Sequence, residues 1–409
     1  MTLVRPFAGL RPASQHASAV AAPPYDVLNT EEARVRAKGK PHSFLHISKP
    51  EIDLPAATDP YAAVVYETGA KNLNTLVTGG VLIRDTEPHY YVYRLKMGEH
   101  MQTGIVVAAS VADYDTNRVR KHEFTRPDKE DDRVRQIEAL NAQTGPVLMA
   151  YKADDAVDSI LESAAAGAPL YDVTADDGIQ HTLWRIADAA SIDRLTLLFD
   201  AMPALYIADG HHRSAAASRV AAARRGKNKN DAAEYFLAVA FPHDQMRIFD
   251  YNRVIKDLNG LSKDAFLAKI VERFDVTPAA AQVKPDKPTR FGMYMDGTWY
   301  RLDMKPTFVP AHDPVARLDV SLLQDNLIAP VLGIADPRRD KRIDFVGGIR
   351  GLGELEKRVN SGEMRVAFSL HPTTLEQLMA VADAGQVMPP KSTWFEPKLA
   401  DGLVSHVLD

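Results

Sequence analysis

Residues 207–217, IADGHHRSAAA, place an acid, a glycine, two histidines and an arginine between a short apolar segment and an alanine-rich stretch. The pattern predicts a strand over 204–208, a turn over 209–213 and a helix over 214–225. The first N–H groups of a helix have no intrahelical acceptor, and the helix dipole adds positive potential there. This stretch therefore predicts a binding site for an anion such as phosphate.

The five turn residues supply the groups that such a site needs. Gly210 lets the backbone approach a ligand closely, and the planar fork of Arg213 suits a phosphate. His211 or His212 can add a second donor, while Asp209 can cap the helix or hold a magnesium ion. A cation in the first turn opposes the helix dipole, so removing Arg213 is expected to leave the ligand-free protein equally or slightly more stable.

Two other interpretations of this turn stay open. In a purely structural one, Asp209 caps the helix and the histidines are satisfied within the fold. A zinc site is less favoured, because adjacent histidines tend to point apart and no H-x-x-x-H spacing or third ligand is nearby. The basic segment RRGKNK at 224–229 is expected to be a solvated helix end, where the dipole favours cations.

A second dense cluster of charge is KHEFTRPDKEDDR at 121–133. His122 and Glu123 follow an expected strand and turn, at a loop position that can face a cleft. Phosphoryl transfer needs cations around the transferring group, carboxylates to place Mg²⁺, and a base or positioning group for the acceptor hydroxyl. The residues available for these roles are Glu123, Arg126, Lys129, Asp132 and Arg133. A solvated helix face with i,i+4 ion pairs explains the same charges equally well.

The elements that must position these residues alternate strands and helices. Strands are expected at 44–48, 89–97, 104–115 (running into an acidic turn) and 234–241, and a helix from about Glu130 with Pro127 near its start. With the strand–turn–helix of 204–225, this alternation predicts an α/β unit.

The texture of the sequence changes near residues 257–260. Beyond that point we expect a helix capped by Ser262, a hairpin turn at Asp296-Gly297, and a capping box formed by Thr373 and Glu376. The fold class is therefore α/β (α+β) with two domains. Residues 1–256 form a mixed-sheet core that carries the DGHHR turn, and residues 257–409 form an additional α+β region.

Composition excludes several classes of protein. Among 409 residues there is no cysteine, which removes disulfides, thiolate zinc sites, iron–sulfur clusters and cysteine nucleophiles. No run of eighteen apolar residues and no signal-peptide pattern are found, so we expect no membrane association and a cytoplasmic location. A net charge of −5 lacks the basic excess of a dedicated nucleic-acid binder, and no nucleic-acid partner is expected. A homo-oligomer is left open.

Two levels of resemblance extend this picture. The stretch LYIADGHHRSAAA resembles the phosphate-binding turn of the ParB/sulfiredoxin superfamily, in which G-x-x-R or G-x-H-R opens a helix. The whole chain resembles the bacterial and archaeal "domain of unknown function 1015" family. The stretches that carry this resemblance are APPYDVL (22–28), FLHISKPE (44–51), KHEFTRPDKEDDR (121–133), TGPVLMAY (144–151), IADGHHR (207–213), DYNRVIKDLNGL (250–261) and MPPKSTWFEPK (388–398).

The resemblance implies a ParB/sulfiredoxin-like core and an activity. Members of the superfamily include kinases that phosphorylate free serine, and the 1015 family has been linked to a version that uses pyrophosphate. It therefore implies a phosphotransferase acting on the hydroxyl of a small molecule, with free L-serine as the leading acceptor. The donor would be pyrophosphate or a nucleotide, with Mg²⁺ expected and Asp209 as its candidate ligand.

The resemblance also favours roles for residues that spacing leaves undecided. Glu123 is the first choice for the base that receives the hydroxyl proton and Asp132 the second, with His122 beside them. The remaining candidates bind phosphate or substrate: Arg126, Lys129 and Arg133 for phosphate, and Asp26, Thr144, Lys391 and Ser392 for substrate. Local structure offers an alternative for the last four, since Asp26 can cap a helix and the others lie in ordinary loop or turn sequences.

Two other classes of function compete with the phosphotransferase. The first is a non-catalytic, nucleotide-binding regulator of the ParB type, disfavoured by the net negative charge and the lack of an evident basic recognition helix. The second is a metal-dependent phosphoesterase, disfavoured by the missing metal-ligand spacing. The sequence also lacks a G-x-x-x-x-G-K-[ST] loop, so an ATP donor would have to use the DGHHR turn.

Overall fold

The computed structural model describes residues 2–227 and 231–409. It divides into two compact units, the first formed by residues up to Met246 together with Pro397–Asp409, and the second by Arg247–Glu396. This division differs from the expected boundary after residue 256 in two respects. β14 (Tyr251–Ile255) pairs with two strands of the second unit, and the C-terminal segment returns to the first unit. Both differences come from long-range pairing, which local sequence patterns do not encode.

The first unit is an α+β fold built on a large mixed sheet, which confirms the expected class. The strands follow the order β6-β11-β8-β12-β5-β4-β10-β9, with β1 paired to β5. Neighbours are antiparallel except at β6–β11 and β8–β12. The strands of this unit are β1 (Val4–Arg5), β2 (Leu10–Pro12), β3 (Leu82–Arg84), β4 (Tyr90–Met97), β5 (His100–Ser110), β6 (Val119–Arg120), β7 (Ala142–Gln143), β8 (Val147–Tyr151), β9 (Tyr171–Thr174), β10 (Gln180–Ile186), β11 (Leu205–Asp209), β12 (Tyr235–Pro242) and β21 (His406–Val407).

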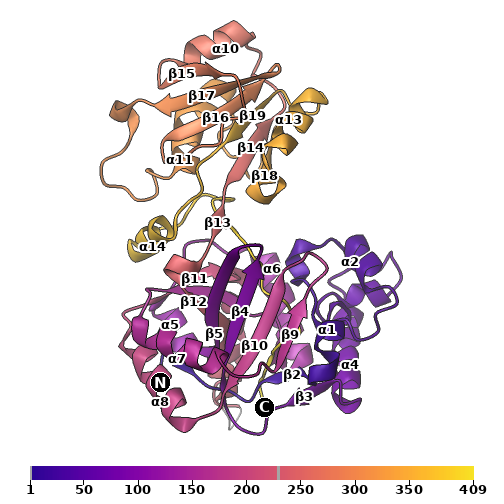
Figure 1. The fold of residues 1–409 in the computed structure, drawn as a ribbon. Coiled ribbons are helices and arrows are strands. Elements are labelled where there is room, and N and C mark those ends of the chain that lie inside the picture. The colour runs from indigo at the N-terminus through magenta and orange to yellow at the C-terminus, as the bar shows by residue number, and fades with distance from the viewer. Residues whose placement is uncertain (1, 228–230) are drawn as a thin grey trace. The chain divides into compact units, whose positions relative to one another are not determined.

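Helices cover this sheet and extend one edge of it. They are α1 (Ala17–Val20), α2 (Thr30–Ala37), α3 (Leu45–Ser48), α4 (Ala63–Thr78), α5 (Val111–Asp115), α6 (Pro127–Leu140), α7 (Asp155–Ala165), α8 (Ala189–Ala201) and α9 (His211–Arg224). Side chains of α7, α8 and α9 join those of the central strands in one apolar core. The helices α1, α2 and α4 gather at the sheet edge formed by β9 (Figure 1) and enclose a second core.

Helix α9 is thin on both of its packed faces because alanines line it. Ala215, Ala217 and Ala221 lie in the main core, while Ala216 and Val220 pack against residues of α6 and the C-terminal segment. Small side chains let α9 approach both the sheet and α6 closely. The chemistry-bearing residues at its N-terminus are therefore held by a well-packed element.

Several local expectations are confirmed and others are wrong. The strand at 89–97 is β4, the buried strand after residue 104 is part of β5, and α6 begins at Pro127. FLHIS forms the helix α3 rather than a strand, because its residues are buried without alternation and so short an apolar run is ambiguous. The capping box lies one residue later than expected, at Thr374 and Gln377. The alternative in which Asp209 caps α9 is excluded, as described below.

The second unit is built on an antiparallel sheet in the order β15-β17-β16-β19-β14-β18. Its strands are β13 (Ile248–Phe249), β14, β15 (Phe274–Ala279), β16 (Arg290–Met295), β17 (Thr298–Met304), β18 (Ile343–Gly347), β19 (Val366–Ser369) and β20 (Trp394–Phe395). Its helical segments are α10 (Lys263–Ile270), α11 (Asp319–Leu323), the π-helical turn η7 (Gln324–Ile328), α12 (Ala329–Leu332), α13 (Leu352–Asn360) and α14 (Leu375–Asp383). Ser262 caps α10, and Asp296-Gly297 forms the hairpin turn with positive φ at both residues, as expected.

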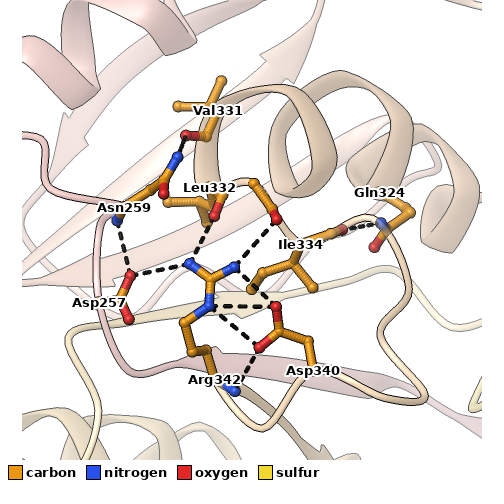
Figure 2. Close-up of polar contacts among 9 residues, drawn as sticks. Asp257, Asn259, Gln324, Val331, Leu332, Ile334, Asp340 and Arg342 are labelled. Atoms are coloured by element: carbon orange, nitrogen blue, oxygen red, sulfur yellow. Dashed lines mark hydrogen bonds and ion pairs between the residues drawn. The ribbon is translucent and has the colours of Figure 1, made fainter.

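Arg342 holds the end of α12 to the loop that follows β14 (Figure 2). Its guanidinium donates to the carbonyl of Leu332 at 3.1 Å and to the carboxylates of Asp340 at 2.8 Å and Asp257 at 3.3 Å. Last-turn carbonyls of a helix lack intrahelical donors, so a cation at this position satisfies them. Asp257, which belongs to the DYNRVIKDLNGL stretch, therefore has a structural role as a partner of Arg342.

Candidate anion-binding site

The DGHHR turn forms the strand–turn–helix predicted for it, but the helix starts three residues earlier. β11 ends at Asp209, Gly210 has φ 98° at the N-cap position, and α9 begins at His211. A left-handed φ favours glycine, and a Cβ added here would lie 3.0 Å from Nε of Arg213. Among the described residues, no side chain caps this helix, so its N-terminus is not closed by Asp209.

Arg213 lies in the first turn of α9 and is nearly buried. Its side chain is 10% exposed, and Nη1 donates to the backbone carbonyl of Pro146. Nη2 lies 3.7 Å from Oδ2 of Asp26 and 3.9 Å from Oδ1 of Asp209, distances that make charge pairs but exceed hydrogen-bond range. Burial alone would lower the pKa of Arg213, but Asp26 and Asp209 outweigh it and raise the pKa above its ordinary value.

Asp209 lies between two cations. Nζ of Lys398, from the C-terminal segment, lies 3.3 Å from Oδ2 of Asp209, whereas Arg213 lies nearer to Oδ1. Burial would raise the pKa of Asp209, yet the charges of Lys398 and Arg213 lower it to about 2. Asp209 is therefore a permanent carboxylate that links the two cations.

The two histidines before Arg213 differ in their surroundings. His211 is buried, and its ring packs edge-on against that of His122 at a centroid distance of 4.5 Å. Burial, followed by the neighbouring His122, lowers the pKa of His211 well below its ordinary value, so the ring is neutral. The backbone N–H of His122 donates to Nε2 of His211 at 3.4 Å, which leaves the proton of the neutral ring on Nδ1. That atom lies 3.7 Å from Oε2 of Glu123.

This geometry separates the two residues proposed for proton transfer. Glu123 keeps a side chain that is 38% exposed, with His211 behind it. His122 is completely buried, and burial lowers its pKa to about 4. In this structure His122 packs against His211, and Glu123 is the member of the pair that solvent can reach.

Arg133 and Asp132 form a second buried group beside Arg213. Nη2 and Nε of Arg133 donate to Oδ2 of Asp132 at 2.6 and 2.9 Å, and the hydroxyl of Tyr66 donates to its Oδ1 at 2.8 Å. The guanidinium of Arg133 stacks on the ring of Tyr25 at 4.0 Å. Because both oxygens of Asp132 already accept strong hydrogen bonds, it is poorly suited to be a base and instead positions Arg133.

A small cavity of 30 Å³ lies beneath Arg213 and Arg133. Thr144 and Gly145 line it, as do Tyr25 and Asp401. Its volume is about that of one or two water molecules. Of the candidate substrate residues, the structure thus brings Asp26 and Thr144 to the Arg213 site.

The other candidates of the 121–133 cluster have other partners. Arg126 is exposed and donates to Asp128 at 2.9 Å, and Nζ of Lys129 donates to the hydroxyl of Tyr61 at 2.8 Å. The backbone N–H of Arg126 donates to Nε2 of His212 at 3.0 Å, so His212 links the N-terminus of α6 to α9. Burial lowers the pKa of His212. These contacts support the structural interpretation for Arg126 and Lys129.

Lys391 and Ser392 belong to the second unit. Lys391 has a positive φ of 61°, and its carbonyl accepts from Nη2 of Arg253 at 3.0 Å. Oγ of Ser392 donates to the carbonyl of Pro389 at 2.5 Å, and its own carbonyl accepts from Thr373 at 2.9 Å. Both residues therefore serve a tightly held loop of that unit.

Sequence reasoning missed Lys398 and Asp401. Lys398 ends the MPPKSTWFEPK stretch, yet nothing local connects it to a turn 189 residues earlier.

The basic segment expected at 224–229 is partly paired. Arg225 donates to Glu234 at 2.9 Å, while residues 228–229 lie outside the described part of the chain. Within residues 2–227 and 231–409, no group of three or more His, Asp or Glu side chains is placed to hold a metal ion.

Comparison with known proteins identifies the family of the chain. The family model described as "Protein of unknown function (DUF1015)" matches residues 4–321, and the chain belongs to this family. No curated protein matches it. In the described part of the chain, every helix is too short or too polar to cross a bilayer.

Solved structures show only a distant similarity. A free serine kinase in complex with AMP is 12% identical, with 73% of this chain and 92% of that chain covered and a TM-score of 0.35. SbnI with a C-terminal truncation, from Staphylococcus aureus, is 12% identical over 72% of this chain and 85% of that chain, with a TM-score of 0.37. A conserved hypothetical protein from Pyrococcus furiosus is 14% identical over 73% and 93%, with a TM-score of 0.34. Similarity at this level assigns neither an activity nor a ligand.

Proposed function

We propose that the chain is a phosphotransferase that moves a phosphoryl group from pyrophosphate or a nucleotide to the hydroxyl of a small molecule. The observation that carries the proposal is Arg213, a nearly buried cation at an uncapped helix N-terminus, held by charge pairs rather than by hydrogen bonds to carboxylates. A phosphate oxygen can take the hydrogen bonds that these carboxylates do not accept. Free L-serine is the leading acceptor on the strength of the family resemblance.

In the proposed reaction Glu123 receives the proton of the acceptor hydroxyl. The hydroxyl oxygen forms a bond to phosphorus while the bond between phosphorus and the bridging oxygen of the donor breaks, and the leaving phosphate keeps that electron pair. Arg213 and the first amides of α9 neutralise charge on the transferring group. His211 is the neighbour that would orient Glu123 during the reaction, because its Nδ1 lies 3.7 Å from Oε2 of the carboxylate.

The carboxylates near Arg213 are too few to hold Mg²⁺ by themselves, but they fit an Mg²⁺ ion that arrives bound to the phosphates of the donor. Mg²⁺ is commonly bound through one or two carboxylates together with substrate phosphates. Asp209 and Asp26 are the residues that would hold it, and it would neutralise charge on the donor.

The test is to incubate the protein with L-serine and Mg²⁺, together with pyrophosphate or ATP, and to follow phosphoserine by ³¹P NMR. Glu123→Gln should keep the fold and donor binding but lose about 10²–10⁴-fold in turnover. Glu138→Gln, on the exposed face of α6, is the matched control and should keep full activity. Donor binding without turnover in the wild type would favour the nucleotide-binding regulator. A loss of turnover below tenfold in Glu123→Gln would show that another residue is the base.

A further inference from the structure

The C-terminal segment Pro397–Asp409 is built into the first unit. The backbone N–H of Asp401 donates to the carbonyl of Ala22 at 2.9 Å, and the N–H of Ala22 donates back to the carbonyl of Asp401 at 3.1 Å. Ser405 and Leu10 exchange backbone hydrogen bonds in the same way. β21 adds to β7, and the N–H of Ala400 donates to the hydroxyl of Tyr93 at 3.1 Å. These contacts fix the segment beside the loop that holds Tyr25 and Asp26.

The segment brings a cation and an acidic group to the surroundings of Arg213. Lys398 contacts the far oxygen of Asp209. Asp401 is 1% exposed and lines the cavity beneath Arg213. Its Oδ1 faces Gly145, where an added Cβ would lie 3.7 Å from that oxygen. Among the described residues, that oxygen has no hydrogen-bond partner. A buried carboxylate oxygen without a donor is costly, so its placement needs a reason.

We propose that the C-terminal segment completes the anion site, with Lys398 as a second anion-binding cation and Asp401 as a buried acidic group that lines the same cavity as Arg213. This inference rests on the anion-binding part of the proposed function. Lys398 and Arg213 approach different oxygens of Asp209, so an anion that takes the place of this carboxylate would meet both cations. Both residues lie beyond residues 4–321, the part matched by the family model.

Asp401 also makes anion binding depend on pH. Burial raises its pKa to about 7 against the opposing charge of Arg213, with Asp26 acting in the same direction as burial. The backbone N–H of Tyr25 and the charge of Arg133 act in the direction of Arg213. An anion bound next to this group adds negative charge and favours the protonated carboxyl. Binding is therefore coupled to proton uptake by Asp401 above neutral pH.

The experiment titrates pyrophosphate into wild type and variants by calorimetry, without acceptor. Lys398→Gln should weaken binding about ten- to a hundredfold, the loss expected for one charge-assisted contact, and Lys398→Arg should recover part of it. Lys152→Gln, an exposed lysine of the same unit, is the charge-matched control and should bind as the wild type does. Melting curves establish that each variant is folded.

For Asp401, the readout is the pH dependence of binding between pH 6 and 9. The protonation of pyrophosphate itself is common to wild type and Asp401→Asn, so the difference between the two curves reports Asp401. The wild type should lose affinity more steeply above pH 7 than Asp401→Asn, whereas a purely structural role would change stability and leave the two slopes equal. Equal slopes, or normal binding by Lys398→Gln in a folded variant, overturn the inference.

The two proposals fail in different ways. A protein that binds pyrophosphate through Lys398 but forms no phosphoserine would refute the phosphotransferase and leave this inference standing. A wild type that binds no pyrophosphate would overturn this inference, and the proposed function would then require a nucleotide as the donor.

Discussion

Replacing Arg213 with alanine should destabilise the ligand-free protein, although the sequence alone suggests the opposite. The sequence argument considers only the helix dipole, which disfavours a cation in the first turn. In the structure, removal of Arg213 takes away the cation that Asp26 and Asp209 share, although Asp209 keeps Lys398, and it removes the hydrogen bond to Pro146. Arg213 therefore offsets a local excess of negative charge.

The size of the effect follows from these contacts. Loss of the hydrogen bond costs about 1 kcal/mol. Each charge pair near 3.8 Å would be worth about 4 kcal/mol at an effective dielectric constant of 20. The carboxylates of Asp26 and Asp209 are 41% and 37% exposed, so solvent screening reduces each pair to about 1 kcal/mol. The total is about 2–4 kcal/mol, or a fall in Tm of roughly 5–10 °C.

Differential scanning calorimetry of the ligand-free protein measures this effect. Arg219→Ala is the matched control, since Arg219 lies on the same helix, is 45% exposed and pairs with Asp131 and Glu130. It should cost less than about 1 kcal/mol. Arg213→Lys should restore part of the stability and only part of the binding of pyrophosphate, because a point charge cannot supply the fork. An Arg213→Ala protein as stable as the wild type would refute the role assigned to these charge pairs.

Three further outcomes are expected. Gly210→Ala should cost about 1–3 kcal/mol and weaken pyrophosphate binding, because it combines a left-handed φ with a Cβ 3.0 Å from Arg213; unchanged binding in calorimetry would contradict this. Asp401→Asn should stabilise the protein by about 2–3 kcal/mol more at pH 8 than at pH 5, measured by urea unfolding. The raised pKa of about 7 means that the native state binds the extra proton between about pH 4 and 7, so the wild type loses stability as pH rises through that window; a pH-independent difference would speak against it. Tyr66→Phe should cost about 1 kcal/mol by removing the donor to Asp132, and an unchanged urea midpoint would show that this hydrogen bond contributes nothing.

The strand–turn–helix around DGHHR could be predicted from the sequence because its signals are local. An acid, a glycine and a basic residue between an apolar strand and an alanine-rich helix define the turn within about ten residues, and backbone geometry does the rest. Hairpin and helix-start signals such as Asp296-Gly297 and Ser262 succeeded for the same reason. Where two local patterns overlapped, as at Thr373 and Thr374, sequence spacing could not choose between them.

The surroundings of the turn depended on tertiary structure. Which charges neutralise Arg213, which of Glu123 and His122 reaches solvent, and which oxygens of Asp132 are already occupied all follow from contacts between distant segments. Lys398 and Asp401 reach the site only because the C-terminal segment returns to pair with the first strands and loops of the chain. The sequence by itself determined the local geometry that can receive an anion. The charge and burial around that geometry were decided by tertiary structure, because electrostatic interactions act between neighbours in space, wherever those neighbours lie along the chain.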